Sequence, residues 1–484
     1  MVINPSLMIG IPLFIGFLIP VAKLAGKSLP RYLSGGTILF NLIASIFLLD
    51  SALKSPVVEY MGGWKPPFGI VFYAGPLGSM LALLISTISM LTWIYLPEYI
   101  EGGDKEKFYM LYLLLTAGAT GMVLTGDLFN LFVFTEITSI ASFSLLAYAK
   151  GKDEKEAMEA TIKYIIIGSL SSAFFLIGIA MLYSVTGTLN MADLAHRIKS
   201  ADPRAVSLSM MFIITGLGIE AEMFPLNGWT PDAYTGAIHP VSAVFAGIVV
   251  KAGLYALARV MFSIYASTTA LSILMIFGVI TLIVGESAAL RQKDLKRMLA
   301  YSSIGQMGLV LTALGIGTQT AVVGGLYAFL NHAFAKSLLF MAAGAFIISL
   351  GTRNIEALDG MGKKMPVTSL MFTIGAFSIM GLPFFGGFIS KITIIYGSVD
   401  AGHIFIAALI LGASVIELVY FLRVVQRIWM REPSDVDVER ASNASIIPML
   451  ALASIVILMG IYPQVFFKVL GPAAHELLKA IGGA

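Results

Sequence analysis

The sequence predicts an all-α polytopic membrane protein with about fourteen transmembrane helices. Of its 484 residues, 58% are hydrophobic and only 12% are charged, whereas an ordinary soluble chain is about 25% charged. The mean hydropathy is +0.89. A chain with so little polar surface needs lipid around most of its length, so we expect a multi-pass protein of the cell membrane.

Fourteen stretches match the length of about 20 mostly apolar residues that a spanning helix needs. They lie near residues 3–22, 32–50, 74–97, 108–125, 128–149, 160–184, 205–234, 240–264, 268–289, 297–316, 320–350, 367–397, 403–428 and 445–467. The first is expected to be a spanning helix and not a cleaved signal, because no basic segment precedes it. Residues 55–73 are rich in Gly and Pro and predict an external loop or hairpin. Residues 190–200 predict a short interfacial helix.

The basic residues predict the orientation of the chain. Nineteen of the 31 lysines and arginines lie in or beside the odd-numbered loops, counted from the N-terminus, and five lie in the even-numbered loops. Loops rich in Lys and Arg stay in the cytoplasm. The sequence therefore predicts cytoplasmic odd-numbered loops and both termini outside.

Composition also restricts the chemistry. The chain has no cysteine and only five histidines, which excludes disulfides, iron–sulfur clusters and thiolate zinc sites. We expect no metal site, no cofactor and no catalytic redox centre in this chain. The net charge is +3 and no basic block is present, so nucleic-acid binding is not predicted.

Ten charged residues inside the predicted spans are not assigned to the adjoining loops, and each costs about 2.5–3.5 kcal/mol at a helix centre on insertion scales. They are Glu136, Lys163, Glu220, Glu222, Lys251, Arg259, Glu286, Lys336, Lys391 and Glu417. So many unfavourable residues indicate a polar interior in which these groups pair, meet water and titrate. Glu136, Lys251, Lys336 and Lys391 lie deepest in apolar runs and are the strongest functional candidates.

A structural role stays open for others. Arg259 lies near the end of a span and can extend its charge to the interface. Glu286 precedes the basic loop 291–297 and is expected to pair with that loop. Lys163 lies one or two turns inside its span and fits either role, and Glu417 is intermediate.

Two spans are predicted to be broken. Residues 223–231 (Met-Phe-Pro-Leu-Asn-Gly-Trp-Thr-Pro) interrupt the seventh span, and residues 381–388 (Gly-Leu-Pro-Phe-Phe-Gly-Gly-Phe) interrupt the twelfth. Proline removes a backbone donor, and carbonyls freed at this depth need protein or water nearby. Ordinary proline kinks are the alternative.

The two breaks occupy corresponding places in two blocks of five spans. Such paired breaks are typical of inverted repeats with an ion path at the midplane. The sequence therefore predicts a first repeat over residues 108–264 and a second over 265–430. Residues 1–107 would supply three N-terminal helices, and residues 431–484 the fourteenth helix and a tail.

Several motifs resemble one known family. Gly285–Gly308 closely resembles a signature of the antiporter-like subunits of respiratory complex I, a family that includes the D-type subunit of Mrp sodium/proton antiporters and matching subunits of membrane-bound hydrogenases. Phe224–Tyr234, Lys251–Tyr255, His332–Phe340 and Gly381–Lys391 also look like motifs of this family, in the same order. Together the motifs cover residues 108–430, and Gly62–Ile70 looks most like the Mrp and hydrogenase branch.

The resemblance implies a fourteen-helix subunit with two inverted repeats that moves protons, or exchanges sodium ions for protons, through a row of buried charges and water. The predicted proton pathway comprises Glu136, Glu220, Glu222, Lys251, His332, Lys336, Lys391 and Glu417. The expected partners are other integral membrane subunits of an Mrp-like, hydrogenase-like or complex I-like assembly. Whether the assembly is a redox-driven enzyme or an antiporter is left open.

One departure from the family concerns Glu220, which stands where relatives usually have a lysine. Glu136, Glu220 and Glu222 would then place three carboxylates in the first half. Burial and like charge favour their protonated forms, and oxygen ligands suit a hard cation such as sodium. The alternative is a structural subunit that keeps the fold without conducting. A redox-active subunit and a stand-alone transporter are further, less favoured alternatives.

Overall fold

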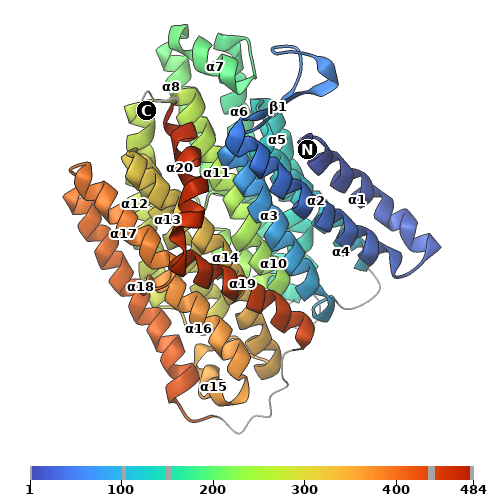
Figure 1. Ribbon diagram of the computed structural model, residues 1–484, viewed down its shortest axis with the longest axis vertical. Coiled ribbons are helices and arrows are strands. Elements are labelled where there is room, and N and C mark those ends of the chain that lie inside the picture. The colour runs from blue at the N-terminus through green and yellow to red at the C-terminus, as the bar shows by residue number, and fades with distance from the viewer. Residues whose placement is uncertain (1–2, 101–104, 149–153, 434–441, 480–484) are drawn as a thin grey trace.

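The computed structural model describes residues 3–100, 105–148, 154–433 and 442–479. These residues form a bundle of long, roughly aligned helices, with one small two-stranded hairpin at an end of the bundle (Figure 1). Lys150, Lys152 and Arg440, which contributed to the predicted orientation, lie outside the described residues.

The first half of the bundle contains the helices α1 (Leu7–Ala25), α2 (Leu29–Lys54), α3 (Pro76–Tyr95), α4 (Lys105–Leu124), α5 (Leu128–Leu146), α6 (Glu154–Thr186), α7 (Met191–Arg197), α8 (Pro203–Glu220), α9 (Thr230–Gly236), α10 (His239–Val244) and α11 (Val250–Val260). Two π-helical turns, η5 (Phe245–Val249) and η6 (Met261–Tyr265), join and extend the last two. The second half contains α12 (Thr268–Leu290), α13 (Leu295–Ile316), α14 (Gln319–Leu350), α15 (Met361–Lys364), α16 (Pro366–Met380), α17 (Gly386–Asp400), α18 (Ile404–Met430), α19 (Asn443–Ile461) and α20 (Pro463–Lys479).

Twelve continuous helical stretches among the described residues are long and apolar enough to cross a membrane. They coincide with all the predicted spans except the seventh and the twelfth. Those two are divided as predicted, the seventh into α8 and α9 and the twelfth into α16 and α17. The polytopic helical class is therefore confirmed, while the exact number of crossings stays a prediction.

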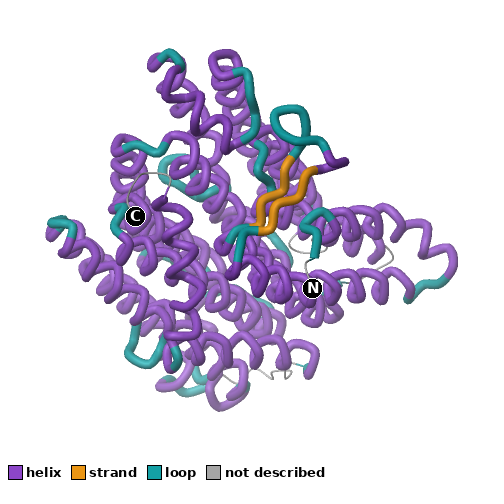
Figure 2. The backbone as a smooth tube through the Cα atoms, turned by 45° about the horizontal axis from the view of Figure 1, so that its top comes forward, coloured by secondary structure: helices purple, strands orange, loops and turns teal. Residues whose placement is uncertain are grey.

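The two polar segments predicted between the spans form a hairpin and a short helix. β1 (Val57–Tyr60) pairs antiparallel with β2 (Val71–Ala74), with Val57 opposite Ala74. In Figure 2, where the top of Figure 1 comes forward, the hairpin (orange) lies in front of the helices. The short helix predicted over residues 190–200 is α7, and the side chain of its N-cap residue Asn190 accepts a hydrogen bond from the Asp193 amide.

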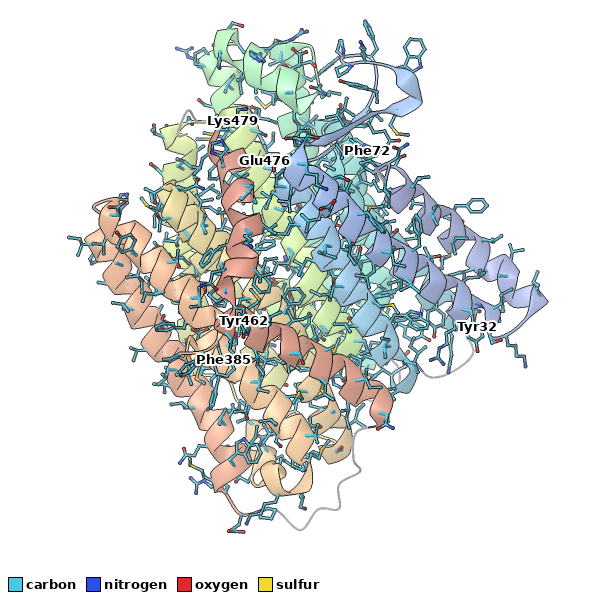
Figure 3. The ribbon with its side chains drawn as sticks, in the orientation of Figure 1. Tyr32, Phe72, Phe385, Tyr462, Glu476 and Lys479 are labelled. Carbon is cyan, nitrogen blue, oxygen red and sulfur yellow. The ribbon has the colours of Figure 1, made fainter. Side chains whose placement is uncertain are left out.

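The segment expected to be a tail differs, because it is helical up to Lys479. Leu470, Ala473, Ala474, Leu477 and Leu478 recur at helical spacing and are all buried. This apolar stripe packs α20 against α3 and α14. Figure 3 shows α20 rising from the bend at Tyr462 to Glu476 and Lys479.

Burial is uneven across the bundle. The span His239–Tyr265 and α13 are buried almost throughout, whereas only a third of the most apolar stretch of α1, α6, α12 or α18 is buried. The outer helices expose large apolar side chains, such as Phe14 at 68% and Leu24 at 87%. Lipid is the solvent that suits this surface, and the buried helices around α13 hold the charged residues.

Candidate ion-translocation site

The eight residues of the predicted proton pathway are called the row below. Its first carboxylate, Glu136, lies on α5 and is half-buried. The Ser172 hydroxyl of α6 donates a hydrogen bond to it. Helix α5 begins at Asp127, whose carboxylate accepts a hydrogen bond from the Asn130 amide at 2.8 Å. This cap places Glu136 well inside the helix, facing α6.

Helix α8 ends at the first break in a Schellman motif. The Met223 amide donates to the Gly218 carbonyl at 2.9 Å, and the Glu222 amide donates to the Ile219 carbonyl at 3.2 Å. Glu222 therefore has the left-handed conformation that this motif requires, with φ at +58°. Glycine is the usual residue at such a position.

Helix α16 ends at the second break in the same way. The Leu382 amide donates to the Phe377 carbonyl and the Gly381 amide donates to the Ser378 carbonyl, both at 3.1 Å. Gly381 has φ at +79°. Glu222 thus occupies in the first break the backbone position that glycine occupies in the second.

Both carboxylates at the first break are buried, with Glu220 4% and Glu222 0% exposed. Oε1 of Glu220 and both carboxylate oxygens of Glu222 have no hydrogen-bond partner among the described residues. Glu220 interacts electrostatically with Glu136, and Glu222 does so with Lys251 and Lys336. Glu222 is therefore the carboxylate of the first break that acts on the lysines.

Lys251 lies in the middle of the buried α11 and is 1% exposed. Its Nζ atom is 3.1 Å from the Met307 sulfur and 5.1 Å from the centre of the Phe329 ring. These soft, apolar contacts do not neutralise an ammonium group. The carboxylate of Glu222 is the acidic group that acts on Lys251.

His332 and Lys336 follow one turn apart on α14. His332 Nε2 is 3.1 Å from the Ser303 hydroxyl. Lys336 is fully buried, donates to the Leu299 carbonyl at 3.1 Å and lies 5.3 Å from the centre of the Phe421 ring. The two residues occupy the middle of the row.

Lys391 and Glu417 form the far end of the row. They make an ion pair between α17 and α18, with side chains 9% and 1% exposed. The Lys391 ammonium also donates to the Met380 carbonyl at 3.2 Å, where α16 ends. Gln306 donates to the other oxygen of Glu417 at 2.7 Å.

Helix α13 contacts nearly every member of the second half. Along one helix, Leu299, Ser302, Ser303, Gln306 and Met307 reach in turn Lys336, Tyr420, His332, Glu417 and Lys251. Sequence reasoning recognised this stretch as a family signature but assigned no role to its neutral side chains. The sequence signal was the concentration of Ser and Gln in a buried span.

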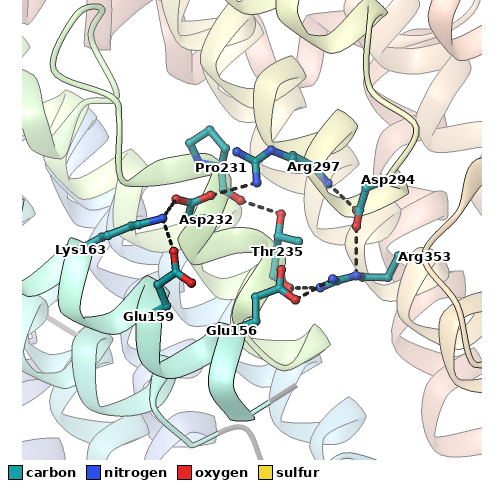
Figure 4. A network of polar contacts seen from close by, with 9 residues as sticks. All are labelled: Glu156, Glu159, Lys163, Pro231, Asp232, Thr235, Asp294, Arg297 and Arg353. Carbon is teal, nitrogen blue, oxygen red and sulfur yellow. Dashed lines mark hydrogen bonds and ion pairs between the residues drawn. The ribbon is translucent and has the colours of Figure 1, made fainter. Parts of the chain in front are cut away.

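Three of the ten span residues lie outside the row, namely Lys163, Arg259 and Glu286. Lys163 is 45% exposed and pairs with Glu159 and Asp232. It belongs to a surface network with Arg297, Asp294 and Arg353 at one end of the bundle (Figure 4). Arg259 donates to the Thr125 carbonyl and lies 5.7 Å from the centre of the Tyr73 ring, as expected near a span end.

Glu286 corrects one expectation. The sequence predicts that it pairs with the basic loop 291–297, but it is 1% exposed and accepts a hydrogen bond from the Tyr420 hydroxyl at 2.7 Å. The side chain points into the bundle because glycine at position 305 leaves room for its carboxylate.

The row itself consists of carboxylates, lysines and one histidine, with hydroxyl groups beside them. Carboxyl, amino and imidazole groups are able to accept and release protons. Within the part of the chain that the structure describes, no group of three or more His, Cys, Asp or Glu side chains is arranged to hold a metal ion.

Comparison with known proteins relates this site to one family. The family model described as "NADH:quinone oxidoreductase/Mrp antiporter, TM" matches residues 125–417. The chain is 36% identical over 444 residues to the N-type subunit of the NADH-quinone oxidoreductase of Desulforudis audaxviator, covering 88% of this chain and 86% of that protein. It is 32% identical over 481 residues to the D-type subunit of the Na+/H+ antiporter of Alkalihalophilus pseudofirmus, covering 97% and 96%.

Solved structures agree. A chain of the membrane-bound sulfane sulfur reductase, an archaeal respiratory membrane complex, has a TM-score of 0.93 and 41% identity, covering 99% of this chain and 98% of that one. A chain of the Mrp complex from Dietzia sp. has a TM-score of 0.90 and 26% identity, covering 99% and 98%. This chain therefore belongs to the NADH:quinone oxidoreductase/Mrp antiporter family of membrane subunits.

Proposed function

We propose that this chain moves protons, or exchanges protons for sodium ions, through its row of buried residues as one membrane subunit of a larger complex. The observation that carries the proposal is the arrangement of the row. Titratable side chains from Glu136 to Glu417 lie inside one bundle, across both broken helices and along α13.

Proton movement along such a row follows from burial and mutual charge. Burial makes the neutral forms of lysine and glutamate accessible near neutral pH. A proton gained or lost at one site changes the proton affinity of the next, which is a coupling free energy between sites. Glu222 is central to this coupling because it acts on both Lys251 and Lys336.

The driving energy would come from partner subunits or from an ion gradient. The relatives are named as subunits of an NADH-quinone oxidoreductase and of a Na+/H+ antiporter, and the structural neighbours are parts of multi-subunit complexes. We infer that this chain also works beside other membrane subunits. The alternative of a non-conducting structural subunit would predict fully paired charges, whereas the close contacts of the Lys251 ammonium are the Met307 sulfur and the Phe329 ring.

The proposal is tested in proteoliposomes that hold the purified complex. Proton movement is measured with a pH-sensitive dye, in media with and without sodium, for the unaltered chain and for Lys251→Ala and Lys391→Ala. Both variants are expected to lose transport, while Lys163→Met, on the surface network, keeps it. Near-normal transport by both alanine variants would overturn the proposal.

The repeats and the orientation belong to the same proposal. The matching ends of α8 and α16 support a first repeat over residues 108–264 and a second over 265–430. The start of α1 and the end of α20 lie toward the hairpin end of the bundle in Figure 1, opposite α15. With the basic loops in the cytoplasm, both termini would be outside, and reporter fusions at either end test this.

A further inference from the structure

Glu286 is a buried carboxylate that the predicted pathway does not include. It lies on α12 and is held from two other helices. The Tyr420 hydroxyl of α18 donates to Oε2, and Gly305 of α13 faces Oε1 so closely that a Cβ there would lie 2.2 Å away. Oε1 itself has no hydrogen-bond partner among the described residues. A buried carboxylate oxygen left unpaired is unfavourable unless the group has a use for it.

Hydrogen bonds and charge connect Glu286 to the row. The Tyr420 oxygen lies 2.7 Å from the Ser302 hydroxyl as well as from Glu286. The next residue on α13, Ser303, contacts His332. The charged groups that act on Glu286 are Glu417 from α18, Lys391 from α17 and Lys336 from α14. The second half therefore holds two carboxylates and two lysines in one cluster.

Polar contacts continue from this cluster along α18 toward one end of the bundle. Arg423 follows Tyr420 by one turn and donates to the Leu290 and Gln292 carbonyls at 3.3 and 2.8 Å. Leu290 follows Glu286 by one turn of α12 in the same direction. Arg427, one turn further, pairs with Asp359 at 3.0 Å. This end carries the loops that follow α12 and α14.

We propose that Glu286 is a further proton-carrying residue, and that Glu286 and Tyr420 connect the Lys391–Glu417 pair with the end of the bundle formed by residues 291–294 and 351–365. The proton moves along hydrogen bonds among Glu286, Tyr420 and Ser302, and the Lys391–Glu417 pair acts on Glu286 through charge. The Tyr420 hydroxyl gives its proton to one oxygen neighbour and receives one from the other, so no co-reactant is needed. The inference rests on the proposed function, because it adds an access route to the same row.

The first test compares Glu286→Gln, Glu286→Asp and Tyr420→Phe in proteoliposomes that hold the complex. Glutamine keeps the size of the side chain and an oxygen that accepts the Tyr420 hydrogen bond, so the fold is retained. Glu286→Gln is expected to lower the proton transport rate at least tenfold and to change its pH profile. Glu286→Asp should restore part of the rate, and Tyr420→Phe should lower it. The matched control is Ser287→Ala, an exposed neighbour on the same helix.

The second test measures from which side the route is open. The chain has no native cysteine, so Ser302→Cys and, as a buried apolar control on α13, Leu309→Cys each introduce a single thiol. Ag+ is added to one side of the vesicles, and the rate at which it protects each thiol from an alkylating reagent is measured on this chain by mass spectrometry. The thiol of Ser302→Cys is expected to be protected faster when Ag+ is added on the side of the 351–365 loop. The thiol of Leu309→Cys should be protected from neither side.

The outcomes separate this inference from the proposed function. If Lys391→Ala abolishes transport while Glu286→Gln keeps the unaltered rate and pH profile, the role of Glu286 is overturned and the proposed function stands. If position 302 is protected no faster than position 309 from the loop side, the route is overturned. If Lys251→Ala and Lys391→Ala both transport normally, the proposed function fails first.

Discussion

Lys391 of α17 and Glu417 of α18 form a buried ion pair directly beside the second helix break. The same ammonium group donates to the Met380 carbonyl, the last residue of α16. The lysine therefore satisfies a carbonyl that the break has freed and a carboxylate that burial has removed from water. Any movement of charge at this pair also disturbs the end of a helix.

The first prediction concerns the stability of this pair. Lys391→Met and Glu417→Gln each leave one buried group without its partner, which costs about 3–5 kcal/mol for a buried pair. The double variant removes both charges and should be less destabilised than the sum of the two single variants. Thermal unfolding of the purified complex measures this. Strictly additive losses would contradict the pair.

The sequence predicted those parts of the site that carry a large energetic signal. A lysine in an apolar run is unfavourable, so Lys251, Lys336 and Lys391 were recognisable, and all three are buried in the bundle. Proline and glycine in mid-span marked both breaks. The short helix α7 and the hairpin were predicted from their polar or Gly- and Pro-rich composition.

The remaining parts depend on contacts between helices that are distant in sequence. Ser302 and Gln306 are neutral and are tolerated in a span, so the concentration of Ser and Gln there was a weak signal, and their role follows from the contacts with Tyr420 and Glu417. Glu286 precedes a basic loop by little more than a turn of helix. The direction of its side chain, which the sequence does not show, decides whether it forms a surface ion pair or lies buried in the bundle. Lys163, which fitted either role, lies at the surface, where it pairs with Asp232 from α9.

The second prediction concerns the left-handed backbone at Glu222. A side chain costs about 1–2 kcal/mol in this conformation, and glycine avoids that cost. Glu222→Gly should therefore be more stable to heat than Glu222→Ala by about 1 kcal/mol. Both variants should lose transport, because both lack the carboxylate that acts on Lys251. Thermal unfolding and transport are measured on the same preparations.

Gly381 holds the equivalent position at the second break, and replacing this glycine by alanine should lower the stability of the protein. Gly381→Ala forces a side chain into φ of +79° and against the Lys391 side chain, 2.9 Å from the added Cβ. Its melting temperature should fall below that of the unaltered complex. If Glu222→Gly is less stable than Glu222→Ala, the left-handed assignment at Glu222 is wrong.

The third prediction uses Lys163 as a residue that is charged and inside a predicted span, yet outside the row. Its partners Glu159 and Asp232 are 69% and 21% exposed, and exposed pairs contribute little to stability. Lys163→Met should therefore leave both the thermal stability and the proton transport rate close to those of the unaltered chain. A large loss of transport in vesicles would place Lys163 in the pathway.

The fourth prediction concerns how closely the two halves of the broken twelfth span approach. A Cβ on Gly387 would lie 1.7 Å from the Ser378 carbonyl oxygen, and that backbone cannot give way without moving α16 from α17. Gly387→Ala should therefore displace Lys391, one turn further along α17, and should lower both stability and transport. Overpacking of this kind typically costs about 1–3 kcal/mol.

Gly412 on α18 provides the matched control, since a Cβ there meets nothing within 4 Å. Gly412→Ala removes backbone freedom from a helix interior and should raise stability by about 0.5–1 kcal/mol without changing transport. The two variants make the same chemical change in the same half of the protein. If Gly387→Ala were as stable and as active as Gly412→Ala, the close contact between α16 and α17 could not be what holds Lys391 against Glu417.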